Sequence, residues 1–128
     1  MRHCLNMTDN VNHPAHYCQY KYEVIKLTER CNFLMGNAFK YILRAPFKGT
    51  EEEDLKKAVW YIKRQHATSA PNLAPIPSRI RAYFWSLDPV LPWLFKYMET
   101  RDKGYLEGAI NLLEWRIEKC STKAKTEN

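Results

Sequence analysis

The chain lacks the sequence features that define several common classes of protein. Its four cysteines include no C-x-x-C pair, so we expect no zinc site of the usual spacing. No G-x-x-x-x-G-K-[ST] segment occurs, which argues against a P-loop nucleotide site. No apolar run has the length of a membrane-spanning helix, and the polar first ten residues do not resemble a signal peptide. We therefore expect a cytoplasmic protein with reduced thiols and no membrane partner.

Strand-like alternation of apolar and polar residues is also missing, whereas apolar residues recur at helical spacing in every long segment. We predict an all-α fold, a compact bundle of about five or six helices. With 128 residues, the chain (1–128) is expected to form a single domain. The expected helices cover residues 21–30, 33–45, 50–64, 78–87, 88–101 and 105–119, and residues 121–128 are expected to form a frayed tail.

Proline divides the chain into two halves. The segment 67–77, ATSAPNLAPIP, contains three prolines and is interpreted as a linker between residues 12–66 and residues 78–120. The two halves share a pattern, because FKY followed by KG occurs once in each of them. Two interpretations of this pattern stay open: a duplicated helical hairpin, or convergence of two amphipathic hairpins. The shared segments are 39–41 with 48–49 and 95–97 with 103–104.

What the chain does contain is a polar, aromatic stretch at 36–64, GNAFKYILRAPFKGTEEEDLKKAVWYIKR. It predicts two helices joined by a loop that contains Lys48, each helix with one stripe of cationic, polar and aromatic side chains. Stripes that face each other would form a pocket for an anion, whereas the alternative is that these are solvated surface residues. The stripes consist of Asn37, Lys40, Tyr41 and Arg44 on the first helix and of Asp54, Lys57, Tyr61 and Arg64 on the second.

The charge of this stretch supports two further expectations. Lysines and arginines number 20 against 14 acidic residues, a net charge of +6 that favours anionic partners. Lys40 and Arg44 repel each other at a spacing of four residues. We therefore expect Arg44→Gln to preserve or slightly raise the stability of the free protein while reducing its response to an anionic ligand.

The start of the second helix permits two interpretations. Thr50 and Glu53 have the spacing of a capping box, and acidic residues in a first helical turn are favoured by the helix dipole. The acids at 51–53 also resemble a carboxylate cluster for a metal ion. We favour capping and predict no metal site, and we assign Asp54 to the polar stripe instead.

Two histidines close to the N-terminus flank a proline in the segment VNHPAHY. Pro14 disfavours helix at the preceding residue, so His13 and His16 are expected to project from a loop. They can bind phosphate or transfer protons, or they can be loop histidines bonded to backbone. A histidine pair can also supply two of the ligands of a metal ion, but no cluster of further ligands stands out in the sequence.

These segments together resemble the family known as domain of unknown function 3310, often labelled phage nucleotide kinase. The resemblance covers residues 12–64 and consists of N-H-P-A-H-Y, G-N-A-F-K-Y, an arginine, K-G and E-D-L-K-K-A. It implies a nucleoside monophosphate kinase without a P-loop, in the cytoplasm of a phage-infected or prophage-carrying bacterium. The matching positions are Asn12, His13, His16, Tyr17, Gly36, Asn37, Lys40, Tyr41, Arg44, Lys48, Gly49, Asp54, Lys57 and Ala58.

The resemblance and the residue chemistry together give a set of candidate site residues. Cationic side chains would hold and neutralise the transferring phosphoryl group. Arg44 can grip a phosphate through two parallel bonds, and an aromatic ring can stack on the base. The candidates are His13, His16, Lys40 and Arg44 for catalysis, and Asn12, Asn37, Tyr41, Lys48, Asp54, Lys57 and Tyr61 for substrate binding.

Other functions stay open. One is a non-catalytic phage accessory protein that binds nucleotide or a host protein, with Trp85, Trp93 and Trp115 as its surface or as core. Another is an all-α nucleoside triphosphate pyrophosphohydrolase, which typically has a helical E-x-x-E pair with a downstream E-x-x-D; it is disfavoured because the chain has only the capping cluster and scattered acids such as Glu23 and Glu29. Nucleic-acid binding is disfavoured because basic and acidic residues are interleaved. The cofactor, with Mg²⁺ beside the nucleotide as the candidate, and a homo-oligomeric state are left open.

Overall fold

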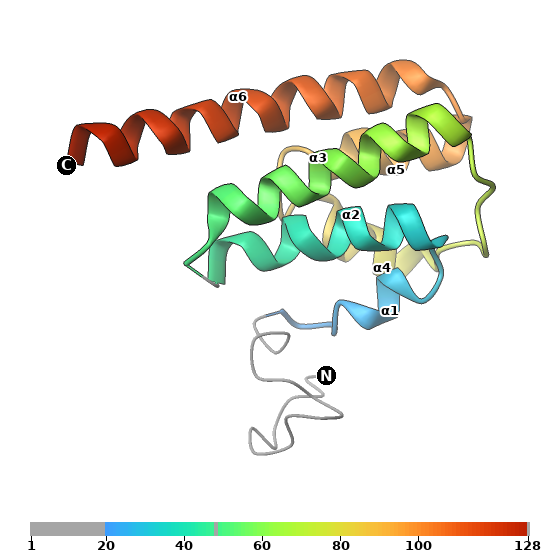
Figure 1. Ribbon diagram of the computed structural model, residues 1–128. Coiled ribbons are helices and arrows are strands. Elements are labelled where there is room, and N and C mark those ends of the chain that lie inside the picture. The colour runs from blue at the N-terminus through green and yellow to red at the C-terminus, as the bar shows by residue number, and fades with distance from the viewer. Residues whose placement is uncertain (1–19, 48, 128) are drawn as a thin grey trace.

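The computed structural model describes residues 20–47 and 49–127 (Figure 1). Within these residues the fold is all-α, as predicted, with no strand. A 3-10 turn, η2 (Ala45–Phe47), follows the second helix, where Pro46 prevents a regular continuation. The α-helices are α1 (Ile25–Thr28), α2 (Phe33–Arg44), α3 (Glu51–Thr68), α4 (Ser78–Trp85), α5 (Leu91–Thr100) and α6 (Lys103–Glu127).

Two helical hairpins form the bundle. Helix α2 packs on α3 and α5 packs on α6, while α3 and α6 lie side by side and join the hairpins (Figure 1). In the core, Phe39 of α2 meets Phe95 of α5 with ring centroids 5.1 Å apart. These are equivalent positions of the repeated FKY pattern, so the structure brings the two copies face to face. That the hairpins superpose stays a prediction.

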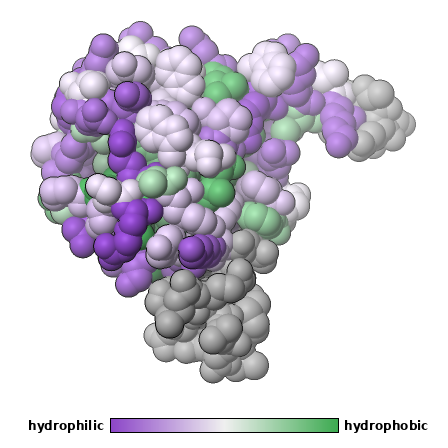
Figure 2. All heavy atoms as spheres, turned by 180° about the vertical axis from the view of Figure 1, so that it is seen from behind, coloured by the Kyte–Doolittle hydropathy of each residue, from purple (hydrophilic) through white to green (hydrophobic). Residues whose placement is uncertain are grey.

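Some helix boundaries differ from those expected. The predicted helix at 21–30 is only α1, whereas α6 continues to Glu127 through the expected tail. Helix α5 begins at Leu91 because the Asp88 carboxylate accepts the Val90 N–H at 2.9 Å and an Arg116 N–H at 2.8 Å, which holds the preceding turn. Seen from behind, the surface is mainly hydrophilic with small apolar patches, and the end of α6 projects past the bundle (Figure 2).

The proline-rich segment between the hairpins is fixed by side chains. Arg101, in the left-handed conformation that ends α5, donates to the carbonyl of Ala70 at 2.7 Å and to the side chain of Asn72 at 2.8 Å. Gln65 at the end of α3 is fully buried, and its amide donates to Ala70 at 2.7 Å and to the Tyr97 hydroxyl at 2.8 Å. The Gln65 oxygen accepts an N–H of Asn32, whose own oxygen caps α2.

None of the helices in the described part of the chain combines the length and the apolar character that a bilayer crossing needs.

The buried Cys31 and the partly buried Tyr20 make the stability of the fold sensitive to alkali. Burial raises the pKa of the Cys31 thiol from 9.0 to about 12. Burial, with smaller effects of Asp88 and Tyr83, raises the pKa of Tyr20 from 10.0 to about 12, and its hydroxyl donates to the carbonyl of Leu43 at 2.7 Å. The unfolded chain loses these protons at lower pH than the folded one. The contribution of these two groups to the free energy of unfolding is therefore fully present below about pH 9 and should be lost as the pH rises toward about 12.

Urea unfolding at a series of pH values tests this expectation. The wild type should lose stability from about pH 9 upward. Cys31→Ala should remove the part of the decline that begins near the ordinary thiol pKa of 9.0. It should keep the part that begins near the ordinary pKa of 10.0 for Tyr20. Parallel curves for wild type and variant would contradict the assignment to Cys31.

Candidate functional site

Tyr41 of α2 lies among three cations, two from α2 and one from α3. The Lys40 ammonium is 4.6 Å from the ring centroid and that of Lys57 is 5.3 Å away. The guanidinium carbon of Arg44 is 5.8 Å from the same centroid. The other neighbour is Tyr61 of α3, whose ring stacks on that of Tyr41 with a centroid distance of 6.0 Å and an interplanar angle of 13°. The two stripes inferred from the sequence therefore meet.

Arg44 is held by a buried carboxylate. Arg44 Nε lies 3.9 Å from Asp54 Oδ2, and the side chain of Asp54 is 2% exposed against 25% for Arg44. The Thr50 hydroxyl donates to the same Asp54 oxygen at 3.1 Å. Among the described residues, the buried Arg44 Nε has no hydrogen-bond partner. Asp54 thus attracts the guanidinium as an opposite charge without a direct hydrogen bond and is itself withdrawn from solvent. We call these six residues the Tyr41 cluster: Lys40, Tyr41, Arg44, Asp54, Lys57 and Tyr61.

The capping box predicted for α3 is wrong. Thr50 occupies the N-cap position, but its side chain accepts no backbone N–H. Its hydroxyl is directed to Asp54 instead, because a buried carboxylate needs a donor more than an exposed helix terminus does. Glu53 pairs with Lys57 at 3.3 Å. In the part of the chain that is described, no three His, Cys, Asp or Glu side chains come together in a way that could hold a metal ion.

The three cations of the cluster differ in their partners. Arg44 faces Asp54, and Lys57 pairs with Glu53 across one turn of α3. No carboxylate of the described residues forms a salt bridge with Lys40. Glu52, at the start of α3, bonds Lys56 and Ser121 instead, and these hydrogen bonds lower the pKa of its carboxyl group. Lys40 is therefore the cation that an incoming anion meets with the least competition.

Two aromatic side chains extend the cluster. Phe33 and Trp60 are 73% and 60% exposed, and their ring centroids lie 5.9 Å and 5.0 Å from that of Tyr61. Both rings stand edge-on to Tyr61, at interplanar angles of 72° and 82°. Sequence reasoning treated Phe33 only as a helix start. Its spacing of four and eight residues from Asn37 and Tyr41 was the signal that could have placed it on the same stripe.

Of the remaining predicted residues, Asn37 lies beside the Tyr41 cluster, and the others lie outside the part of the chain that the structure describes. Asn37 donates from its side-chain amide to the carbonyl of Phe33 at 2.8 Å, within its own helix. It also lines a shallow pocket of about 200 Å³ with Lys40 and Gly36. The residues that lie outside the described part of the chain are Asn12, His13, His16 and Lys48.

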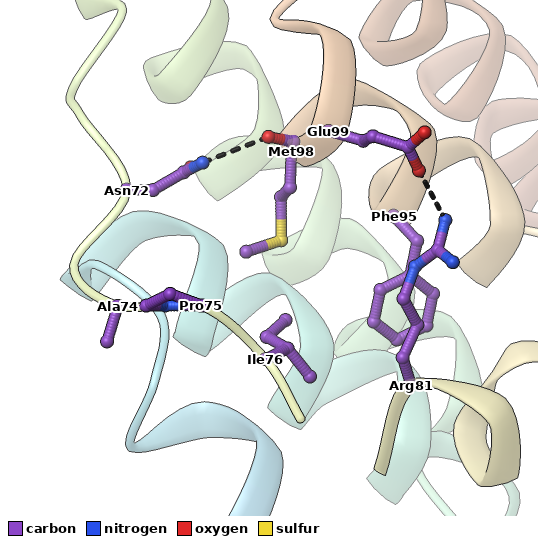
Figure 3. A pocket seen from close by; sticks show the side chains of 8 residues that line it. All are labelled: Asn72, Ala74, Pro75, Ile76, Arg81, Phe95, Met98 and Glu99. Carbon is purple, nitrogen blue, oxygen red and sulfur yellow. Dashed lines mark hydrogen bonds and ion pairs between the residues drawn. The ribbon is translucent and has the colours of Figure 1, made fainter. Parts of the chain in front are cut away.

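A second cavity, of about 280 Å³, lies where the proline-rich segment meets α4 and α5 (Figure 3). At its rim the Arg81 guanidinium pairs with Glu99 at 2.6 Å. The Asn72 side chain donates to the carbonyl of Met98 at 2.9 Å and accepts from Arg101. Because these polar groups bind one another, the cavity offers a ligand few open partners, and the Tyr41 cluster is the better candidate.

The tryptophans of the second half have different surroundings. Trp85 stacks on the buried Phe95 with centroids 6.0 Å apart, so it belongs to the packing of α4 on α5. Trp93 is 40% exposed, and its ring covers Gly108 so closely that an added Cβ would lie 2.4 Å from it. Trp115 is exposed on α6, with the Lys119 ammonium 5.4 Å from its ring. The three do not form one surface of exposed rings.

The first hairpin is the part of the chain for which a comparison with known proteins gives a result. Residues 11–63 match DUF3310, a family described as protein of unknown function. The matched segment contains α1, α2 and most of α3, and with them every residue of the Tyr41 cluster. No curated protein matches the chain, and no solved structure does. The function of the matched segment has to be argued from the cluster itself.

Proposed function

We propose that the chain binds a nucleotide at the Tyr41 cluster and transfers the terminal phosphoryl group of a nucleoside triphosphate to a deoxynucleoside monophosphate, so that both become diphosphates. The supporting observation is that three cations lie within 5.8 Å of one ring that stacks on a second ring. Phosphates need cations, and a base needs the face of a ring. The cluster supplies both within the span of one nucleotide.

Each cation has a distinct part in this proposal. Lys40, which no described carboxylate neutralises, binds the phosphate as a point charge. Arg44 is oriented by Asp54 through its Nε side and so presents its terminal N–H groups, the geometry for two parallel bonds to a phosphate. Lys57 exchanges Glu53 for the ligand at low cost, because an exposed pair at this spacing contributes only a few tenths of a kcal/mol.

Phosphoryl transfer depends mainly on positioning and charge neutralisation, and the cations of the cluster can provide both. A Mg²⁺ ion that arrives with the nucleotide would neutralise further phosphate charge. The acceptor of the phosphoryl group is a phosphate oxygen of the monophosphate, which is largely deprotonated at pH 7, so the transfer needs no carboxylate base. Asp54, which is buried and bonded to Thr50, instead holds the charge of Arg44. The catalytic role of His13 and His16 stays a prediction.

A second candidate is a protein that binds nucleotide without turnover, because the cations and stacked rings that support binding do not by themselves require a reaction. The same cluster would hold the ligand. Chromatography of deoxynucleoside mono- and triphosphates after incubation with the protein separates the candidates. Diphosphate formation would support the kinase, pyrophosphate release a hydrolase, and binding without products the second candidate.

Replacing Lys40 tests the site itself. We expect Lys40→Ala to weaken deoxynucleotide binding by about tenfold or more, the usual effect of losing a hydrogen bond to a charged group. The matched control is Lys96→Ala, because Lys96 is the equivalent position of the second FKY pattern and its ammonium lies 5.9 Å from the ring of Trp85. Calorimetric titration gives both affinities. Equal affinities for Lys40→Ala and Lys96→Ala would place the nucleotide elsewhere.

A further inference from the structure

We propose that the outer face of α2 and α3 binds single-stranded nucleic acid, so that the nucleotide of the Tyr41 cluster is one member of a short run. The inference rests on the proposed function because it extends the same site. Its first support is the number of rings. Phe33 and Trp60 project into solvent on either helix, each in contact with Tyr61. One base can cover one such ring, whereas a run of nucleotides can cover several.

The charges of the two helices provide the second support. Helix α2 and the part of α3 after Asp54 contain no acidic residue. The acids of α3 are confined to its first turn, so within these two helices the interleaving of charges is limited to the start of α3; from another element, Glu114 of α6 reaches Lys63. Six cations occupy these two stretches: Lys40, Arg44, Lys56, Lys57, Lys63 and Arg64.

The rings and cations alternate on the surface. Lys57 and Arg64 lie three residues before and four residues after Trp60, which places all three on one exposed stripe of α3. The ion pairs Lys56–Glu52 and Lys63–Glu114 are exposed, so phosphates can replace these carboxylates at little cost. Cations that track a backbone between rings that stack on bases are the usual arrangement for single strands. A duplex, whose bases are already stacked, would leave the rings unused.

The test compares a labelled oligothymidylate of about ten nucleotides, a typical site size, with thymidine monophosphate. Fluorescence anisotropy and calorimetry on the full chain give the two affinities. We expect the oligonucleotide to bind more tightly, and Trp60→Ala to weaken its binding by about fivefold or more, which is several times the effect on the mononucleotide. Trp115→Ala is the matched control, since Trp115 is equally a solvent-exposed indole, 56% exposed, on α6. Arg64→Gln should lower the slope of log affinity against log salt by about 0.7.

The outcomes separate this inference from the proposed function. If thymidine monophosphate binds but the oligonucleotide binds no more tightly, or if Trp60→Ala behaves like Trp115→Ala, the single-strand proposal is wrong and the nucleotide site stands. That result would also be expected if the exposed rings served a protein partner. If neither probe binds, both proposals fail. Because Phe33 and Trp60 are exposed, their replacement should leave the melting temperature unchanged, and Phe33→Ala serves as a second variant.

Discussion

Arg44→Gln should destabilise the free protein by about 2 kcal/mol, because it leaves the buried Asp54 carboxylate without its cation. The repulsion between Lys40 and Arg44 led us to expect the opposite sign from the sequence. The structure reverses that expectation, since Asp54 is 2% exposed and Arg44 Nε lies 3.9 Å from it. The estimate is below the full cost of breaking a buried pair because Thr50 still donates to the carboxylate. Urea unfolding at neutral pH measures the change.

A double variant distinguishes the pair from other effects of losing Arg44. Arg44→Gln combined with Asp54→Asn removes both charges, so much of the lost stability should return. Lys57→Gln is the control for a lost cation, because its pair with Glu53 is exposed and should contribute at most about 0.5 kcal/mol. An Arg44→Gln protein as stable as the wild type would mean that Asp54 needs no cation. In the same proteins, the response to nucleotide should fall with both Arg44→Gln and Lys57→Gln, because both cations belong to the proposed site, whereas the loss of stability should be confined to Arg44→Gln.

Phe39→Ala should have the largest effect on stability, about 3–5 kcal/mol, because it removes a large side chain from the centre of the core. Phe39 is fully buried, and its ring meets that of Phe95 at 5.1 Å. The loss should affect both hairpins together, so that circular dichroism and tryptophan fluorescence report one transition. The midpoint of urea unfolding measures it.

Phe33→Ala provides the control for this prediction, because it removes the same side chain from the same helix at a position that is 73% exposed. Its cost should stay within about 0.5 kcal/mol. A comparable loss of stability in the two variants would show that Phe39 is not at the centre of the core.

The longer helices were predictable from the sequence because each is amphipathic over two or more turns, whereas α1 has only four residues. The meeting of Lys40 and Tyr41 with Lys57 was also predictable. Helical spacing gives each helix one polar stripe, and the short connection between the helices makes them neighbours. The burial of Asp54 was not, because it depends on how closely α2 and α3 approach, and the spacing of residues does not contain that distance. The capping box failed for the same reason. A local motif assigned the Thr50 hydroxyl to the helix terminus, while a tertiary contact took it.

The proline-rich segment shows a further limit of composition. Its prolines predicted a linker, and it does connect the two hairpins, but the partners that fix it come from residues far along the chain. Arg101 and Gln65, which hold its carbonyl groups, lie in segments whose sequence gives no sign of this role. The length of α6 was underestimated because its last turns look polar and unpatterned by themselves. Arg116, which donates to Asp88, and Ser121, which bonds Glu52, tie this helix to other elements.

The buried amide of Gln65 has a consequence for how the molecule can move. It joins the start of α2 through Asn32, the end of α3, the connecting segment through Ala70, and α5 through Tyr97. A rotation of one hairpin against the other would have to break these bonds together, and each broken bond would leave a polar group in an apolar interior. The connecting segment is therefore not a hinge. Closure around a ligand would have to come from side chains of the Tyr41 cluster, with the two hairpins moving as one rigid body.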